Sequence, residues 1–468
     1  MNLSRDLANE LQAEISRRAF LGQSCGLGAA ALSWLSGSTA TARSDYAPTA
    51  KRVIYLFMSG GPSHVDTFDY KPELTRRNDE QVPESLIDGI HFAMIKTDQT
   101  PLLRGSPFRF QRHGEHGAYV SELLPHLATV VDELAIIKSL RSEVFNHDPA
   151  VSLLNCGDPR VGRPTMGAWL SYGLGKETEE LPAYVVLTSG QKRQPLLDSY
   201  WTNGFLPSEH QGVRFRSQGD PVLFLSNSNN ITRAERRQQI DLIQWMNEQR
   251  FDLFRDPETR GRIAQYETAF RMQTAIPSLM DYSDESRATL DLYGIEPGKP
   301  SFANNCLMAR RMAERGVRFI QLYDMGWDSH GSIVAEHQER CQGIDQGAAA
   351  LIRDLKQRGM LDDTLVIWGG EFGRTPVAQG GGEQWGRDHH PHGFTMWMAG
   401  GGIRGGVVHG NTDDFGFHAV ESPVSVHDFH ATALHCLGIN HEKLTYRHQG
   451  RDFRLTDVAG EVVAPLLT

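Results

Sequence analysis

Aspartate, glutamate and histidine residues recur together at three well-separated places in this chain. The groups are His64, Asp66 and Asp69; Asp324, Asp328 and His330; and Glu371, Asp388, His389, His390 and His392. Mixed carboxylates and imidazoles without paired cysteines suit a divalent ion such as Zn, Mn, Fe or Ca better than a structural cysteine site. A single residue of this kind is usually a hydrogen-bonded loop residue. The prediction of a metal centre therefore depends on the three groups meeting in space.

Each group follows an apolar run that has the composition of a buried strand. These runs cover 53–58, 317–323 and 365–368, a similar run covers 134–138, and helical patterns lie at 302–316 and 335–358. Alternation of strands and helices predicts an α/β fold with a mostly parallel sheet sandwiched by helices. Because ligands gather at the carboxyl ends of parallel strands, the polar groups are expected at one edge of the sheet.

Residues 225–295 differ from the rest of the chain in being strongly charged and helical in pattern. Thr232 and Glu235 have the spacing of a capping box that opens one helix, and Pro257 is expected to start the next helix. No linker rich in Pro, Gly or Ser separates this stretch, which favours a helical insertion packed over the sheet. The alternative is an independent helical domain.

The N-terminal segment 1–42 has the features of a twin-arginine export signal. Arg17 and Arg18 precede a weakly apolar run at 26–35, which is followed by an A-x-A step that signal peptidase can cleave. The alternative is a buried amphipathic helix, but the apolar positions form a block rather than a helical stripe. Residues 43–468 would then form the mature domain, delivered by the twin-arginine translocase to the periplasm or the cell exterior.

The composition of the chain is that of a large globular protein. It has 468 residues, of which 40% are hydrophobic and 22% charged, and a formal net charge of -10. An acidic chain without a long Lys/Arg run is a poor candidate for binding nucleic acid. No segment has the roughly 20 consecutive apolar residues of a stable membrane span. Four cysteines follow the export signal without C-x-x-C spacing, so disulfides and buried free thiols are both open.

Two segments resemble parts of the alkaline phosphatase and sulfatase superfamily. Residues 364–373 (TLVIWGGEFG) resemble the strand that ends in an Asp-Asn-Gly metal-binding turn in sulfatases and in Asp-His-Gly in alkaline phosphatases. Glu371 falls on that Asp. Residues 426–439 resemble the late sulfatase helix. The resemblance implies an alkaline-phosphatase/sulfatase-like fold and places Glu371 among the metal ligands.

The chain is still more similar to the domain of unknown function 1501 family, a family of twin-arginine-exported bacterial proteins within this superfamily. The motifs that carry the resemblance are GRPTMGAW at 162–169, GWDSH at 326–330, GEFGRTP at 370–376 and GRDHHP at 386–391. They span nearly the whole mature chain. The resemblance therefore implies an alkaline-phosphatase/sulfatase-like fold for residues 43–468.

The chain also departs from the superfamily pattern at the positions that carry its chemistry. Ser59 or Gly60 stands where phosphatases have a metal-binding Asp, and Phe372 replaces the second residue of the metal-binding pair. The nucleophile position is His147, so no hydroxyl or thiol is available there for a covalent mechanism. His147 could be a metal ligand, a nucleophile forming a phosphohistidine, or a structural residue at the start of a helix.

Two functions agree with these residues. In the first, a divalent metal activates water to attack phosphate or sulfate esters, including those of anionic small molecules or glycans. Its ligands would be Asp66, Asp328, His330, Glu371 and His392, with His147 as a further candidate, while Arg374 and Arg387 would hold the anionic group. In the second, the metal or anion pocket serves binding only, in a non-catalytic envelope binding or assembly protein.

Overall fold

The computed structural model describes residues 44–90, 92–95, 101–190, 196–216, 222, 227, 231–254, 256–296 and 299–468. The predicted export signal lies outside these residues. A nine-stranded sheet occupies the centre, in the order β12-β4-β11-β8-β1-β7-β5-β6, with β15 also beside β4. Its strands are β1 (Arg52–Ser59), β4 (Leu134–Arg141), β5 (Tyr184–Gly190), β6 (Val213–Arg214), β7 (Phe319–Met325), β8 (Thr364–Gly369), β11 (Phe394–Ala399), β12 (Val407–His409) and β15 (Val424–Ser425).

Most neighbouring strands of this sheet are parallel. β1 pairs in parallel with β7 and β8, and β5 pairs in parallel with β7 and β6. Strand β11 runs antiparallel to both β4 and β8. The four strands predicted from apolar runs are β1, β4, β7 and β8, and the predicted mostly parallel α/β fold is confirmed.

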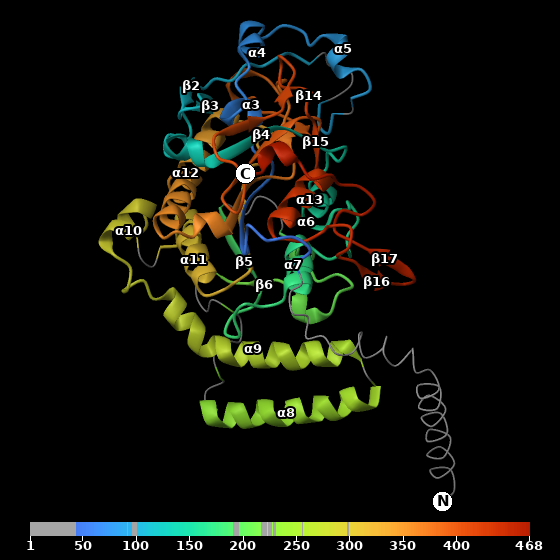
Figure 1. Cartoon of the computed structure of the whole chain (residues 1–468). Helices are drawn as coiled ribbons and strands as arrows, with labels where there is room; N and C mark the ends of the chain where they lie inside the picture. Colours follow the sequence, from blue (N-terminus) through green and yellow to red (C-terminus); the bar gives the residue numbers. More distant parts are fainter. Residues whose placement is uncertain are drawn as a thin grey trace, which may run out of the picture. The chain divides into compact units, whose positions relative to one another are not determined.

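Helices cover both faces of the sheet (Figure 1). α11 (Phe302–Glu314) and α12 (Ile333–Gln357) share one apolar core with Ile54, Leu56 and Met58 of β1. α6 (His147–Cys156), α7 (Met166–Leu174) and α13 (Val426–Cys436) share the other core with Val53, Tyr55 and Phe57. Successive side chains of a strand point to opposite faces, which is why a continuous apolar run serves two cores.

The charged stretch forms three helices, α8 (Arg233–Phe254), α9 (Pro257–Met280) and α10 (Arg287–Tyr293). The capping box is present, because the Glu235 amide donates to Thr232 Oγ1 and the Thr232 amide donates to the Glu235 carboxylate. The C-terminal half of α9 buries Met272, Ile276 and Leu279 in the apolar core that α11 and α12 share with β1.

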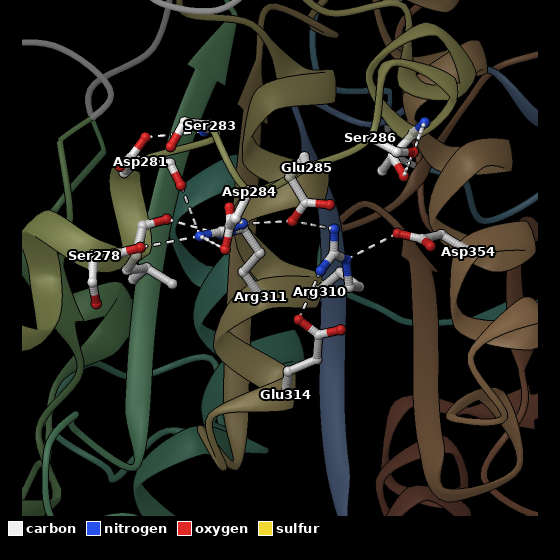
Figure 2. Close-up of polar contacts among 12 residues, drawn as sticks. Ser278, Asp281, Ser283, Asp284, Glu285, Ser286, Arg310, Arg311, Glu314 and Asp354 are labelled. Atoms are coloured by element: carbon white, nitrogen blue, oxygen red, sulfur yellow. Dashed lines mark hydrogen bonds and ion pairs between the residues drawn. The ribbon is translucent and has the colours of Figure 1, made fainter.

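A charge network ties the end of α9 to α11 and α12 (Figure 2). Arg310 is buried and contacts Glu285 at 2.6 Å, Glu314 at 2.7 Å and Asp354 at 2.9 Å. The neighbouring Arg311 donates to the carbonyl oxygens of Ser278, Leu279 and Asp281. A buried charge is costly unless it is paired. The pairing of Arg310 and Arg311 therefore fixes the end of α9 against α11 and α12.

Shorter elements complete the described fold. They are α3 (His64–Thr67), α4 (Pro72–Arg76), α5 (Glu84–Ile87), and the pairs β2 (Phe110–His113) with β3 (Ala118–Ser121), β9 (Gly373–Arg374) with β10 (His389–His390), β13 (Asn411–Thr412) with β14 (Ala419–Glu421), and β16 (Tyr446–His448) with β17 (Arg451–Phe453). The four cysteines in these ranges are free and buried. Among the helices described, none combines the length and apolar composition needed to cross a membrane.

Candidate metal centre

Four side chains from three parts of the chain converge at the carboxyl ends of the sheet strands. They are His147 at the start of α6, Asp328 and His330 after β7, and His389 in β10. One potential ligand atom from each lies within 4.8 Å of all the others. The parallel arrangement of the strands brings these segments to one edge, as the sequence predicted for Asp328 and His330.

The three imidazoles surround one oxygen of Asp328. Asp328 Oδ1 lies 3.1 Å from His147 Nε2, 2.9 Å from His330 Nε2 and 3.3 Å from His389 Nε2. The Nε2 atoms of His330 and His389 are themselves 3.0 Å apart. Ligand atoms that share an ion at about 2.0–2.2 Å lie about 3–4 Å from one another, so these separations fit a single bound metal.

The other ring nitrogen of each histidine is held by an acceptor. His147 Nδ1 is 2.7 Å from Glu371 Oε1, His330 Nδ1 is 2.6 Å from Gln379 Oε1, and His389 Nδ1 is 2.7 Å from the Phe145 carbonyl oxygen. An acceptor requires a proton on Nδ1, which leaves a lone pair on Nε2 in the neutral ring. In the neutral form of each ring, the Nε2 lone pair would therefore face the centre of the cluster.

A bound cation would offset the repulsion between the four converging atoms. Three imidazole lone pairs and a carboxylate oxygen repel one another when nothing positive lies between them. His147 Nε2 is buried and has no hydrogen-bond partner, although Asp328 Oδ1 is 3.1 Å away. That geometry suits two ligands of one ion better than a donor and its acceptor. The donor set, three imidazoles and one carboxylate, fits Zn, Mn or Fe.

The pKa shifts of the cluster agree with an anionic Asp328 and a neutral His389. Burial opposes the charge on Asp328, but the three imidazoles and the Arg374 guanidinium hold its pKa well below the usual range. Burial lowers the pKa of His389. Burial also acts against charge on His147, yet Asp328 and Glu371 on its two sides raise its pKa.

A glycine turn after β1 brings the segments of the cluster together. Gly60 has a φ of 116°, and a Cβ there would lie 2.5 Å from the Asp328 amide nitrogen. Its own amide donates to Glu371 Oε1 at 2.9 Å, and its carbonyl accepts from Arg374. Only glycine combines this backbone conformation with so close an approach. The Gly60 that stands in place of the expected aspartate is therefore a packing position.

The cluster is reachable from solvent on one side. The side chains of His147, Asp328 and His330 are 19%, 21% and 24% exposed, whereas Glu371 is fully buried. Phe372 covers another side, since its ring stacks on His389 at 4.6 Å and lies 5.0 Å from the ring of His147. The side chains of His147, Asp328 and His330 are therefore in part accessible to an exogenous ligand.

Two residues predicted to act directly at the site contact residues of the cluster instead. They are the predicted metal ligand Glu371, which contacts His147, and the predicted anion-binding Arg374, which contacts Asp328. Glu371 holds His147 rather than joining the four converging atoms. Arg374 donates to Asp328 Oδ1 at 2.6 Å, to the Gly61 carbonyl at 3.1 Å and to the Arg387 carbonyl at 3.2 Å. Because Arg374 is fully buried and its donors are used within the protein, it is not placed to grip a substrate anion.

The predicted ligand Asp66 and the predicted anion-binding Arg387 pair with each other instead. Arg387 Nε donates to Asp66 Oδ2 at 2.8 Å and Nη2 donates to Oδ1 at 3.2 Å, with both side chains fully buried. Ser63 Oγ donates to the same carboxylate at 2.5 Å. This ion pair outweighs the cost of burial and lowers the pKa of Asp66. Neither residue is among the four that converge.

The last predicted ligand, His392, lies in a separate group of histidine rings. Its ring centroid is 5.6 Å from that of His390 and 6.0 Å from that of His418. Burial, followed by the effect of His418, lowers its pKa. Two other acidic residues singled out in the sequence are also used elsewhere: Asp69 pairs with Lys71 and Lys138, and Asp324 accepts from Ser189 and Trp327.

His389 is the cluster residue that sequence reasoning did not select. It belongs to the GRDHHP motif, but three histidines stand close together there and composition does not distinguish them. The pairing of β9 with β10 determines which of these histidines joins the cluster. His389 stands opposite Arg374, and the adjacent His390 stands opposite Gly373. His390 instead donates to the Phe417 carbonyl at 2.5 Å and stacks on His64.

Several solved structures are similar to this chain. The lipoteichoic acid synthase LtaP from Listeria monocytogenes is 10% identical with a TM-score of 0.37, over 88% of this chain and 76% of that chain. The PsFucS1 sulfatase from Pseudoalteromonas sp. is 12% identical with a TM-score of 0.33, over 86% and 69% of the two chains. A protein of the alkaline phosphatase superfamily from Vibrio parahaemolyticus is 10% identical with a TM-score of 0.36, over 85% and 68%. No curated protein sequence matches the chain.

One family profile, described as "Protein of unknown function (DUF1501)", matches residues 50–467. The match includes the sheet, its covering helices and all four residues of the cluster. The chain therefore belongs to the DUF1501 family.

Proposed function

We propose that this protein is an exported, metal-dependent hydrolase of phosphate or sulfate esters, with a divalent ion held by His147, Asp328, His330 and His389. The observation that supports it most is the convergence of three imidazole Nε2 atoms on one Asp328 oxygen, with every Nδ1 atom held by an acceptor. Protein histidines that bind metals have their far nitrogen held in this way. Arg17 and Arg18 ahead of the apolar run at 26–35 support the export part of the proposal.

The ion would supply Lewis-acid polarisation of the ester and a nucleophilic water at neutral pH. The residues of the chain have separate tasks around it. Glu371, Gln379 and the Phe145 carbonyl keep the three rings in their orientations, and Arg374 keeps Asp328 charged. Phe372 shields the buried side of the cluster. The ester would approach from the side on which His147, Asp328 and His330 are partly exposed.

His147 occupies the superfamily's nucleophile position, but its contacts favour a ligand. Nδ1 is bonded to Glu371, and Nε2 faces the cluster at 3.1 Å from Asp328 Oδ1. A phosphohistidine would need the Nε2 lone pair, which the proposed ion would occupy. The proposal therefore uses water as the nucleophile and predicts no covalent intermediate.

An activity assay on metal-loaded protein tests this function. Aryl phosphates and aryl sulfates should be hydrolysed by protein loaded separately with Zn, Mn or Fe, and the activity should be lost in Asp328→Ala. His392→Ala is the matched control, because His392 lies outside the cluster and its replacement should leave the activity in place. Hydrolysis that persists in Asp328→Ala, or its absence with every metal and ester, would contradict the proposal.

One observation favours a second candidate, a non-catalytic protein that binds an anionic glycan in the envelope. Arg374 and Arg387 are fully buried and bonded within the protein, so neither is placed to stabilise a leaving ester group. A binding protein could hold a sulfate or phosphate through the metal alone. Metal-dependent retention on a sulfated polysaccharide column, without turnover of any ester, would support this candidate.

A further inference from the structure

Helix α8 presents a stripe of large apolar side chains to solvent. Leu242, Trp245, Met246 and Leu253 are 59%, 58%, 57% and 74% exposed. The opposite face of α8 packs on α9, where Ile240 is buried, Arg237 pairs with Glu267 at 2.7 Å and Arg260 lies over Phe251. Contiguous exposed apolar residues of this kind mark interaction sites more often than chance. In Figure 1 the same helix lies on the outer side of α9.

The spacing of the stripe is that of a coiled-coil seam. Leu242, Met246, Gln249 and Leu253 follow one another at steps of four, three and four residues. This is the 3.5-residue repeat in which one helix packs against another over two heptads. Trp245 lies at the edge of the seam. The natural occupant of such a seam is therefore a second helix with the same repeat.

The charges beside the seam differ between its two sides. At 100° per residue, Asp241 and Glu248 lie on one side of the stripe and Arg236 and Arg250 on the other. Two α8 helices packed in parallel around a twofold axis place the acidic side of each beside the basic side of the other. The same packing puts Trp245 of one helix next to Arg250 of the other, the pairing that parallel coils use and one that permits a cation–π contact.

A lipid surface is a poorer match for this helix. Helices that lie on membranes carry an excess of Lys and Arg on the polar face. α8 has four arginines and four acidic residues, so its charges balance. The whole chain has a net charge of -10, which would be repelled by anionic lipid.

We propose that the exposed stripe of α8 is a self-association surface that pairs with α8 of a second copy of this chain, in parallel and in register. Leu242, Met246 and Leu253 meet their counterparts across the twofold axis, and Gln249 sets the register as the polar residue of the seam. Two heptads form a small interface, so the dimer is reversible and depends on concentration.

Sedimentation velocity of the purified protein tests the proposal over a wide range of concentrations. The average mass should rise from that of a monomer toward twice that value, and Trp245→Glu combined with Met246→Glu should keep the protein monomeric at every concentration. Val458→Glu is the matched control, because Val458 is also an exposed apolar residue, 81% exposed, but lies outside α8. A wild-type protein that is monomeric throughout, or a dimer that survives the double substitution, would overturn the proposal.

Cross-linking tests the orientation. Cys25, which lies in the predicted export signal, is first changed to Ser. Leu242→Cys should then form a disulfide-linked dimer under mild oxidation, since the Cα atoms of equivalent positions in a parallel seam approach to about 6 Å. The other four cysteines are buried. A dimer that cross-links only when Leu242→Cys is mixed with Leu253→Cys would show antiparallel packing and overturn the parallel register. Binding of phospholipid vesicles by a monomeric wild type, lost in the double variant, would assign the stripe to lipid instead.

Discussion

His147 Nδ1 lies 2.7 Å from Glu371 Oε1, and the opposite nitrogen of the same ring faces Asp328. The two residues are 224 positions apart, and the Gly60 amide holds the same Glu371 oxygen at 2.9 Å. A carboxylate behind a metal-binding histidine orients the ring and raises its basicity. Glu371 thus acts on the proposed centre through His147, and it is not one of the four residues whose ligand atoms converge.

Replacing Glu371 should weaken metal binding without abolishing it. Glu371→Ala is expected to lower the affinity for Zn or Mn by roughly 10- to 100-fold, because His147 loses the acceptor that orients it. Glu371→Gln retains an acceptor oxygen and should have a smaller effect. Competition with a chelator of known affinity measures both. Equal dissociation constants for wild type and Glu371→Ala would remove Glu371 from the centre.

The number of bound ions should separate the four converging residues from the other predicted ligands. The purified protein is expected to bind about one divalent ion after reloading. Asp328→Ala and His389→Ala should each remove most of this ion, because each takes a ligand from the cluster. His392→Ala should retain it, since His392 lies elsewhere. Elemental analysis after gel filtration provides the count, and equal loss in all three variants would contradict the ligand set.

Breaking the Asp66–Arg387 pair should affect stability rather than metal content. Asp66→Ala leaves the Arg387 charge buried without its partner and should lower the free energy of unfolding by about 3–5 kcal/mol. The double change Asp66→Leu with Arg387→Met should cost less, because it removes both charges. Urea unfolding gives the free energies, and metal stoichiometry should stay at the wild-type value. Loss of the ion in folded Asp66→Ala would instead restore Asp66 as a ligand.

Acid should destabilise the fold through buried histidines such as His430. Burial lowers the pKa of His430 from 6.5 to about 3, and its Nε2 donates to the Leu154 carbonyl at 2.8 Å. Between these two values the unfolded chain binds a proton that the folded chain does not. The stability contributed by neutral His430 is therefore complete above pH 6.5 and is lost as the pH falls toward 3.

The experiment is urea unfolding at a series of pH values. His430→Asn should reduce the slope of stability against pH by up to about 1.4 kcal/mol per pH unit in this range, because one proton is no longer taken up on unfolding. His116→Gln is the control, since the side chain of His116 is 61% exposed. An unchanged slope in His430→Asn would show that other groups dominate the acid sensitivity.

Export by the twin-arginine route should fail when the arginine pair is replaced. Changing both Arg17 and Arg18 to Lys should leave the precursor in the cytoplasm, because the translocase reads the arginine pair. Cell fractionation with an antibody to the mature domain measures the distribution. Mature protein that still reaches the periplasm or the medium would exclude this route.

Much of the fold follows from local sequence patterns. The apolar runs predicted β1, β4, β7 and β8, and the charged stretch predicted the capping box before α8. These signals are local because a buried strand needs apolar side chains on both faces and a helix needs its first amides capped. Asp328 and His330 follow the apolar run of β7, so the sequence also indicated that they would lie at the end of a parallel strand.

The ligand set depended on contacts between distant segments. The sequence placed Asp66 and Glu371 among the ligands by their positions after strands, yet Asp66 pairs with Arg387 and Glu371 stands behind His147. His389 was hidden among neighbouring histidines until the register of β10 with β9 set which ring faces the centre. Residue type and position after a strand thus determined that carboxylates and imidazoles would meet at this edge. Only the packing of loops from β1, β4, β7 and β8 decided which atoms converge, because a ligand is defined by distances of a few ångströms between residues from separate segments of the chain.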